Sequence, residues 1–167
     1  MILSSSTAHM QFATKIDLSQ FKPTRKRKTR SFNSAVHKSD AYTALLYANG
    51  SVVILGCKTE DDLAIAHLEL AIKLNSVAVK YPKVTNQVYT GSFDRDIKLQ
   101  ESKERLIESE FNAIYEPELF PALVVTLKDF RGKLQVFRTG KYIITGVTRK
   151  DDAETLLNKA KGQLMCA

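Results

Sequence analysis

The chain has 167 residues, of which 44% are hydrophobic and 26% charged, with a formal net charge of +7. These values suit one globular domain, or two small halves with a common core, and no stretch is long and apolar enough to predict a membrane-spanning helix. Cys57 and Cys166 form no disulfide framework, and the start of the chain lacks a secretory pattern, so we expect a reducing, intracellular compartment.

The positive charge is concentrated in residues 22–30, which hold six basic residues and no acid. The remaining chain has 19 basic and 18 acidic residues and is therefore nearly neutral. A basic run of this kind is a solvated loop, a nuclear-import sequence or an arm that contacts phosphates. Clustered cations release counterions from a polyanion, so binding through the run would depend strongly on salt but not on base sequence.

Residues 47–62 and 137–152 resemble each other at a constant offset of 90. Each copy has an apolar run, a turn with glycine, a run rich in β-branched residues, a second glycine and an acidic pair. The turn glycines predict hairpins, and the continuous apolarity of residues 52–55 and 142–145 predicts strands covered on both faces. The matched residues are Gly50 with Gly140, Ile54 with Ile144, Gly56 with Gly146, and Asp61-Asp62 with Asp151-Asp152.

Three helices are predicted. The acidic pairs favour the positive end of a helix dipole, and apolar residues recur behind both pairs at helical spacing. The third helix is predicted over residues 97–110, with Leu99 and Ile107 in helical order. Each half of the chain is thus predicted to be an antiparallel sheet with a helix on one face, which gives an α+β protein.

Catalytic and metal-binding patterns are not found in the sequence. His9, His37 and His67 fall on different predicted elements, and none has metal-ligand spacing to a cysteine or carboxylate. No glycine-rich phosphate loop, nucleophile elbow or Cys-x-x-Cys pair occurs. We therefore predict neither an enzyme nor a bound cofactor or metal.

Residues 115–121, Tyr-Glu-Pro-Glu-Leu-Phe-Pro, resemble a signature of the TATA-box-binding protein (TBP) family. Residues 84–88 resemble the strand between that family's two repeats, residues 97–99 the start of the helix that follows, and residues 137–146 its second repeat. The similarity covers about residues 10–162. It implies a TBP-like saddle, in which repeats 1–80 and 81–167 form one curved antiparallel sheet with helices on the convex face.

The resemblance also implies a transcription initiation factor that binds A·T-rich promoter DNA in the minor groove. There, aromatic side chains insert as wedges between neighbouring base pairs, and an asparagine amide donates to adenine N3 and thymine O2. Aliphatic side chains pack on the floor of the groove, because A·T pairs lack the amino group that guanine places there. The wedge positions of the family match Phe32 and Tyr47 in the first repeat and Phe120 and Phe137 in the second. The remaining groove positions match Val53, Leu55, Asn86, Val88, Ile143 and Thr145.

Further expectations concern phosphates and partners. The loop that touches general transcription factor IIB in the family matches Glu116, Glu118 and Leu119. The first-repeat helix is basic in the family but acidic here, so it gives no prediction for factor IIA. The resemblance and the basic run together predict a nuclear protein, and the apolar concave face predicts a homodimer in the absence of DNA. The candidate phosphate contacts are Arg25, Lys26, Arg27, Lys28, Lys38, Lys58, Arg131 and Lys141.

A second interpretation is a partner-binding paralogue with weak or non-TATA DNA binding. It rests on the first repeat, in which Ser5 and Thr7 fall at the family's asparagine and valine positions and Leu55 at a threonine position.

Overall fold

The computed structural model describes residues 1–23 and 34–165. Five predicted site residues lie outside this range, namely Arg25, Lys26, Arg27, Lys28 and Phe32. None of the helices within the range has the length and apolarity needed to span a bilayer.

The chain divides into two compact units, which are described separately. The N-terminal unit is Ser5–Thr85, and the C-terminal unit is Met1–Ser4 together with Asn86–Ala167. Two long strands, β1 (Ile2–Phe12) and β6 (Ala78–Ser92), contribute residues to both units.

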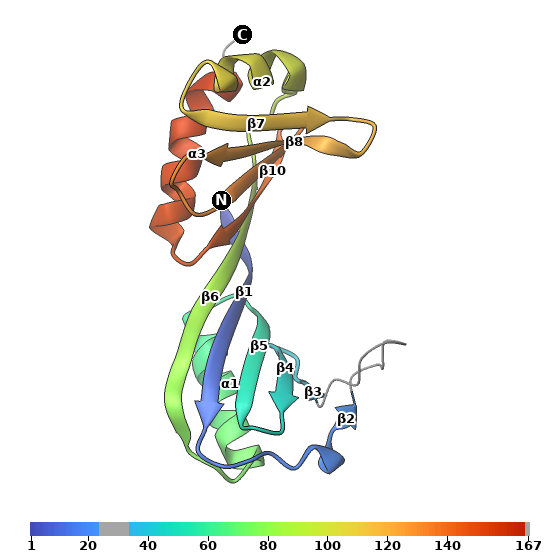
Figure 1. The fold of residues 1–167 in the computed structure, drawn as a ribbon, viewed down its shortest axis with the longest axis vertical. Helices are drawn as coiled ribbons and strands as arrows, with labels where there is room; N and C mark the ends of the chain where they lie inside the picture. Colours follow the sequence, from blue (N-terminus) through green and yellow to red (C-terminus); the bar gives the residue numbers. More distant parts are fainter. Residues whose placement is uncertain (24–33, 166–167) are drawn as a thin grey trace. The chain divides into compact units, whose positions relative to one another are not determined.

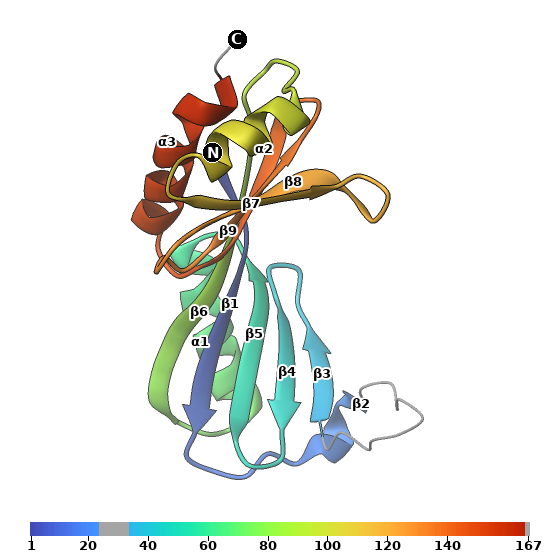
Figure 2. The same cartoon turned by 45° about the horizontal axis from the view of Figure 1, so that its top comes forward.

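The N-terminal unit is an antiparallel sheet with one α-helix against it (Figure 1). Its strands lie in the order β2-β3-β4-β5-β1-β6, and Figure 2 shows β5, β4 and β3 side by side. Its other elements are the short 3-10 helix η1 (Leu18–Gln20), β2 (Lys22–Pro23), β3 (Ser34–Lys38), β4 (Thr43–Tyr47), β5 (Ser51–Cys57) and α1 (Glu60–Lys73).

The C-terminal unit repeats this arrangement with a second full helix. Its strands lie in the order β6-β10-β9-β8-β7, and α2 contacts β7, β8 and α3. Its elements after β6 are α2 (Leu99–Ile107), β7 (Phe111–Glu116), β8 (Phe120–Leu127), β9 (Lys133–Phe137), β10 (Lys141–Val147) and α3 (Lys150–Met165).

The sequence repeat is a structural repeat with the same offset. The bounds of β4 and β9, and those of β5 and β10, differ by 90 residues, and so do the starts of α1 and α3. The predicted hairpins are confirmed: the Gly50 N–H donates to Tyr47 O at 3.0 Å, and the Gly140 N–H to Phe137 O at 2.9 Å. Both glycines have positive φ, +87° and +78°, which other residues rarely adopt.

The acidic pairs begin helices, as predicted. Thr59 caps α1, and the Asp62 carboxylate accepts the backbone N–H groups of Lys58 at 2.8 Å and Thr59 at 3.0 Å. These hydrogen bonds favour the ionised carboxylate and lower the pKa of Asp62. Asp151 and Asp152 likewise lie in the first turn of α3, where the Asp152 carboxylate accepts a hydrogen bond from the Arg149 guanidinium at 3.3 Å.

The predicted third helix is shorter than residues 97–110, and its buried face differs from the prediction. Leu99, Ser102 and Leu106 form the buried face of α2, at the spacing of three and then four residues that a helix requires. Ile107 lies one position beyond that stripe, at the end of the helix, and is 52% exposed. Ile107 is therefore not a core residue, although its side chain is apolar.

The expectation that both faces of the strands are covered is wrong within this chain. In β5, Val52 and Ile54 are fully buried toward the helix side, whereas Val53 and Leu55 are only half-buried. Residues 142–145 in β10 alternate in the same way. Each sheet thus has a buried face under its helix and a second face, here called the open face, on which aliphatic side chains remain accessible.

We predict that Gly140→Ala lowers the free energy of unfolding by about 2–4 kcal/mol, because positive φ strains an alanine and its Cβ would clash with Arg95 O. The matched control is Gly162→Ala in α3, where a Cβ meets no atom within 4 Å. This control should raise stability by about 0.5–1 kcal/mol through helix propensity. Urea unfolding of both variants measures the difference, and equal effects would contradict the assignment.

Candidate nucleic-acid interface

The open face of the C-terminal unit is a continuous row of side chains across its five strands. In the sheet register, Ile143 lies opposite Thr90 on one side and Gln135 on the other. Val124 continues the row opposite Gln135, and Ile114 lies opposite Val124. Apart from Thr90 and Gln135 the row is aliphatic, so the face offers an apolar floor with few polar groups.

Two aromatic rings, Phe120 and Phe137, stand at one end of this face. Their centroids are 6.2 Å apart and their planes meet at 66°, an edge-to-face contact. Phe137 of β9 pairs with Ala122 of β8 in the register. Phe120 lies two residues before Ala122 in β8, so it is on the same side of the sheet as Phe137. Phe120 is 41% exposed, although burial would favour a large apolar ring. The pair is thus an exposed aromatic edge held by two strands.

Asn86 is held in one orientation by a backbone donor. Its Oδ1 accepts the Gly146 N–H at 2.8 Å, and this N–H can bond only to the carbonyl end of the amide. The Nδ2 group of Asn86 keeps its two donor hydrogens for another acceptor. Val88 and Thr90 follow at every second position of β6, alternating with the buried Tyr89. The oriented amide of Asn86 therefore lies on the same face of β6 as Val88 and Thr90.

A hollow of about 660 Å³ lies beside Phe137. Phe137, Tyr142 and Ile143 form apolar parts of its wall, and Arg138 and Lys141 supply cations. Burial raises the pKa of the Tyr142 phenol, with a smaller contribution from the Asp94 carboxylate, so the phenol stays protonated at neutral pH. An apolar wall with two cations suits a nucleotide, which presents an apolar sugar face beside a charged phosphate.

The open face of the N-terminal unit carries the corresponding first-repeat residues. Val53 lies opposite Leu45 and His9, and Leu55 lies opposite Thr43 and Thr7. Tyr47 occupies the same hairpin position as Phe137, at the offset of 90. Each unit thus gathers its described groove and wedge residues on one face of its sheet.

The sequence reasoning missed several members of these faces. His9, Leu45 and Val36 in the N-terminal unit, and Thr90 and Ile114 in the C-terminal unit, follow the same alternation as the predicted residues. In β1, the buried Ala8, Met10 and Phe12 would have indicated that His9 points the other way.

The four described phosphate candidates are exposed: Lys38 ends β3, Lys58 follows β5, Arg131 lies between β8 and β9, and Lys141 begins β10. The alternation of β3 and β10 places Lys38 and Lys141 on the open faces. Lys133, opposite Thr145 in β9, is a further exposed cation on the open face of the C-terminal unit.

The candidate partner loop connects β7 to β8. Glu116 pairs with Phe120 across the hairpin, and the Leu119 N–H donates to Glu116 O at 2.9 Å. This turn leaves Glu118 exposed and Leu119 81% exposed. A tight turn therefore displays an acid and an apolar side chain together, next to the aromatic pair.

The described ranges, 1–23 and 34–165, contain no group of three or more His, Cys, Asp or Glu residues that could hold a metal ion. What the two units display is a repeated α+β fold with open aliphatic sheet faces, an exposed aromatic pair and flanking cations, an arrangement suited to binding an extended polymer.

Comparison with known proteins identifies the family of the chain. The family model "Transcription factor TFIID (or TATA-binding protein, TBP)" matches residues 3–77 and 81–166, and the chain belongs to this family. The fold is similar to that of Methanococcus jannaschii TBP, with a TM-score of 0.76 and 23% identity over 97% of this chain and 96% of that chain. The predicted α+β fold of the TBP type is therefore confirmed.

Two relatives illustrate the sequence similarity. The chain is 37% identical to TATA-box-binding protein 2 of Methanosarcina acetivorans over 124 residues, 72% of this chain and 67% of the relative. It is 31% identical to the TATA-box-binding protein of Pyrococcus furiosus over 134 residues, 77% of this chain and 68% of the relative. The family is one of transcription factors.

We predict that Asn86→Ala lowers the free energy of unfolding by about 1–3 kcal/mol, because the partly buried Gly146 N–H loses its acceptor. Asn86→Asp retains an acceptor oxygen at that place and should unfold close to the parent protein. Urea titration of the three proteins tests this order, and equal losses in both variants would show that the hydrogen bond does not hold the amide.

Proposed function

We propose that the chain is a transcription initiation factor that binds A·T-rich promoter DNA in the minor groove and recruits general transcription factor IIB. The observation that carries this proposal is the exposed aromatic pair, Phe120 and Phe137, beside an aliphatic open face and the oriented amide of Asn86.

The aromatic pair supports wedge insertion. A ring that enters between two base pairs must be accessible, apolar and held by its backbone, and Phe120 and Phe137 meet these conditions on adjacent strands. Inserting apolar wedges and bending the duplex in this way is established for TATA-binding proteins. Tyr47, and Phe32 outside the described residues, would be the corresponding pair of the first repeat.

Asn86 and its neighbours support a preference for A·T pairs. The minor groove of an A·T pair offers only acceptors, adenine N3 and thymine O2. Because the Gly146 N–H occupies Oδ1 of Asn86, the Nδ2 group of Asn86 can donate to these acceptors. A G·C pair adds the guanine amino group, which would collide with an aliphatic floor. The groove residues of this proposal are Val53, Leu55, Asn86, Val88, Ile143 and Thr145, with Thr90 as an addition from the structure.

The cations support contacts to the DNA backbone and a steep salt dependence. Those proposed are the described Lys38, Lys58, Arg131 and Lys141 and, in the basic run, Arg25, Lys26, Arg27 and Lys28. Nuclear localisation stays a prediction that rests on the basic run, and the relatives compared above are archaeal.

The loop of Glu116, Glu118 and Leu119 supports the recruitment of factor IIB, because it is exposed and keeps the residue types of the family's contact loop. No factor IIA contact is proposed, since α1 exposes Ile65, Leu68 and Ile72 rather than a basic surface. Without DNA, the open aliphatic faces favour self-association of two copies.

One feature favours a second function, partner binding with weak or non-TATA DNA binding. His9 faces Val53, and Leu45 stands where the second repeat has Gln135. Imidazole can act as a hydrogen-bond partner for the guanine amino group, so His9 would relax the A·T preference of the first repeat.

We predict that Phe120→Ala combined with Phe137→Ala abolishes DNA bending while the protein remains folded, because the two wedge rings are removed from the surface. Energy transfer across a doubly dye-labelled A·T-rich duplex measures the bend, with a G·C-rich duplex for comparison. The control is Leu119→Ala, an exposed apolar residue next to the pair that should leave bending unchanged. DNA bending by the double variant that equals that of the parent protein would contradict the assignment of Phe120 and Phe137 as wedges.

We predict that Glu118→Arg weakens binding of factor IIB by at least about tenfold, or about 1.4 kcal/mol, because it reverses a charge at the centre of the exposed loop. DNA bending should be retained. Glu108→Arg, which reverses an exposed charge just after α2, is the matched control. Titration of each variant with labelled factor IIB measures the affinity, and unchanged binding by Glu118→Arg would contradict the proposed contact.

A further inference from the structure

The two units differ in what covers the helix side of their outer strands. In the C-terminal unit the nine-residue helix α2 packs on β7, β8 and α3. In the N-terminal unit the segment between β1 and β2 contains the three-residue η1, and β2 has only two residues. Within residues 1–23 and 34–85, no helix takes the place that α2 has in the other unit.

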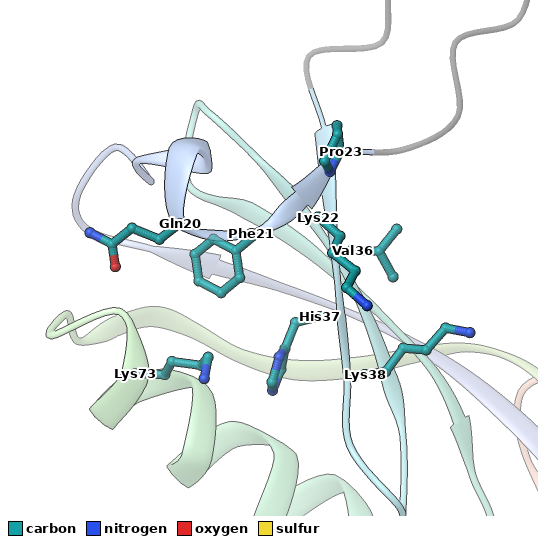
Figure 3. Close-up of a pocket in the computed structure, with 8 residues that line it drawn as sticks. All are labelled: Gln20, Phe21, Lys22, Pro23, Val36, His37, Lys38 and Lys73. Atoms are coloured by element: carbon teal, nitrogen blue, oxygen red, sulfur yellow. The ribbon is translucent and has the colours of Figure 1, made fainter.

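A hollow of about 630 Å³ lies in the N-terminal unit at this place (Figure 3). Figure 3 shows Phe21 from the segment before β2, His37 from β3 and Lys73 from α1 around the same space. Lys22 and Lys38 line it at the edge of the sheet. Its volume is within the range of ~300–1,000 Å³ that is typical of binding pockets.

The internal repeat identifies this hollow with the space that α2 fills. His37 lies opposite Ala44 in the register, as Val125 lies opposite Leu134, so the two positions correspond. Val125 is fully buried, whereas His37 is only half-buried.

The helix at the back of the hollow gives the same correspondence. Lys73 corresponds to Gln163 at the offset of 90, and in the C-terminal unit Arg105 of α2 donates from Nε to Gln163 O at 2.9 Å. A helix placed in the hollow as α2 is placed would therefore contact both Lys73 and His37.

The charge around the hollow selects the occupant. Three lysines are among its lining residues: Lys73 from α1, and Lys22 and Lys38 at the sheet edge, whose side chains leave β2 and β3 on the open-face side. Glu69 lies near it and takes a hydrogen bond from the Ser39 hydroxyl at 3.4 Å. Partial burial and the nearby Lys73 lower the pKa of His37, with Glu69 acting in the opposite direction, so the ring is neutral at neutral pH. The balance is cationic, and the rings of Phe21 and His37 add an apolar surface.

We propose that this hollow binds an acidic amphipathic helix of a partner protein, which takes the place that α2 occupies in the C-terminal unit. Its apolar face packs on Phe21 and His37, and a carboxylate pairs with Lys73 where Arg105 meets Gln163 in the other unit. Residues 24–33 hold five basic residues and no acid, so their charge does not complement that of the hollow. The hollow shares Lys38, at the sheet edge, with the phosphate contacts proposed above, whereas Lys73 comes from α1 and His37 lies on the helix side of β3.

The test uses two capped, fluorescein-labelled peptides and the full chain. The first peptide is residues 97–110 of this protein with Lys103→Glu and Arg105→Glu, which makes the helix strongly acidic. The second is the unchanged 97–110 peptide. Fluorescence anisotropy should show that the acidic peptide binds at least about tenfold more tightly than the unchanged one, a difference of about 1.4 kcal/mol. Equal affinities, or no binding by either peptide, would overturn the proposal.

Two variants of the chain locate the binding. Lys73→Glu should weaken the acidic peptide by at least about tenfold, while Lys161→Glu, at an exposed position of α3, should leave it unchanged. Both variants should still bend A·T-rich DNA, which separates failure of this site from failure of the proposed function. Loss of DNA bending in Lys73→Glu would overturn the proposal and indicate a phosphate site instead.

Discussion

The structure depends on a one-sided covering of each sheet. Side chains alternate between the two faces of a strand, and α1, or α2 and α3, bury only one of them. Leu46, Ile54 and Leu70 close the core of the N-terminal unit, and Leu106 and Ile144 belong to that of the C-terminal unit. Since the helices supply the stability on their own side, the opposite face is left free to remain aliphatic and accessible.

This arrangement also explains how a polar residue can serve the open face without weakening the fold. Asn86 satisfies a backbone donor, Gly146 N–H, at the point where the register between β6 and β10 shifts. The same hydrogen bond sets which end of the amide remains available. One side chain thus serves the fold and the proposed recognition of DNA, and a substitution that keeps the acceptor separates the two roles.

The two repeats share a frame but have diverged at their outer edges. The hairpins, helix starts and positive-φ glycines keep an offset of 90, and the glycines supply the backbone conformation that the two hairpin turns require. Among the described residues, a helix in the position of α2 is found in the C-terminal unit and not in residues 5–23 or 34–85, and His37 is half-buried where Val125 is fully buried. Apolar character alone does not predict which residues of α2 are buried, because Leu106 faces the core and Ile107 does not.

The sequence by itself determined the repeat, the glycine hairpins, the helices that begin at the acidic pairs, and the membership of the TBP family, because these follow from local spacing and from a specific motif. Only the tertiary structure decided which strand face stays open, and which atom holds the amide of Asn86. It also revealed the hollow at His37 and Lys73. These features depend on register and helix packing between residues far apart in the chain, and no local pattern encodes them.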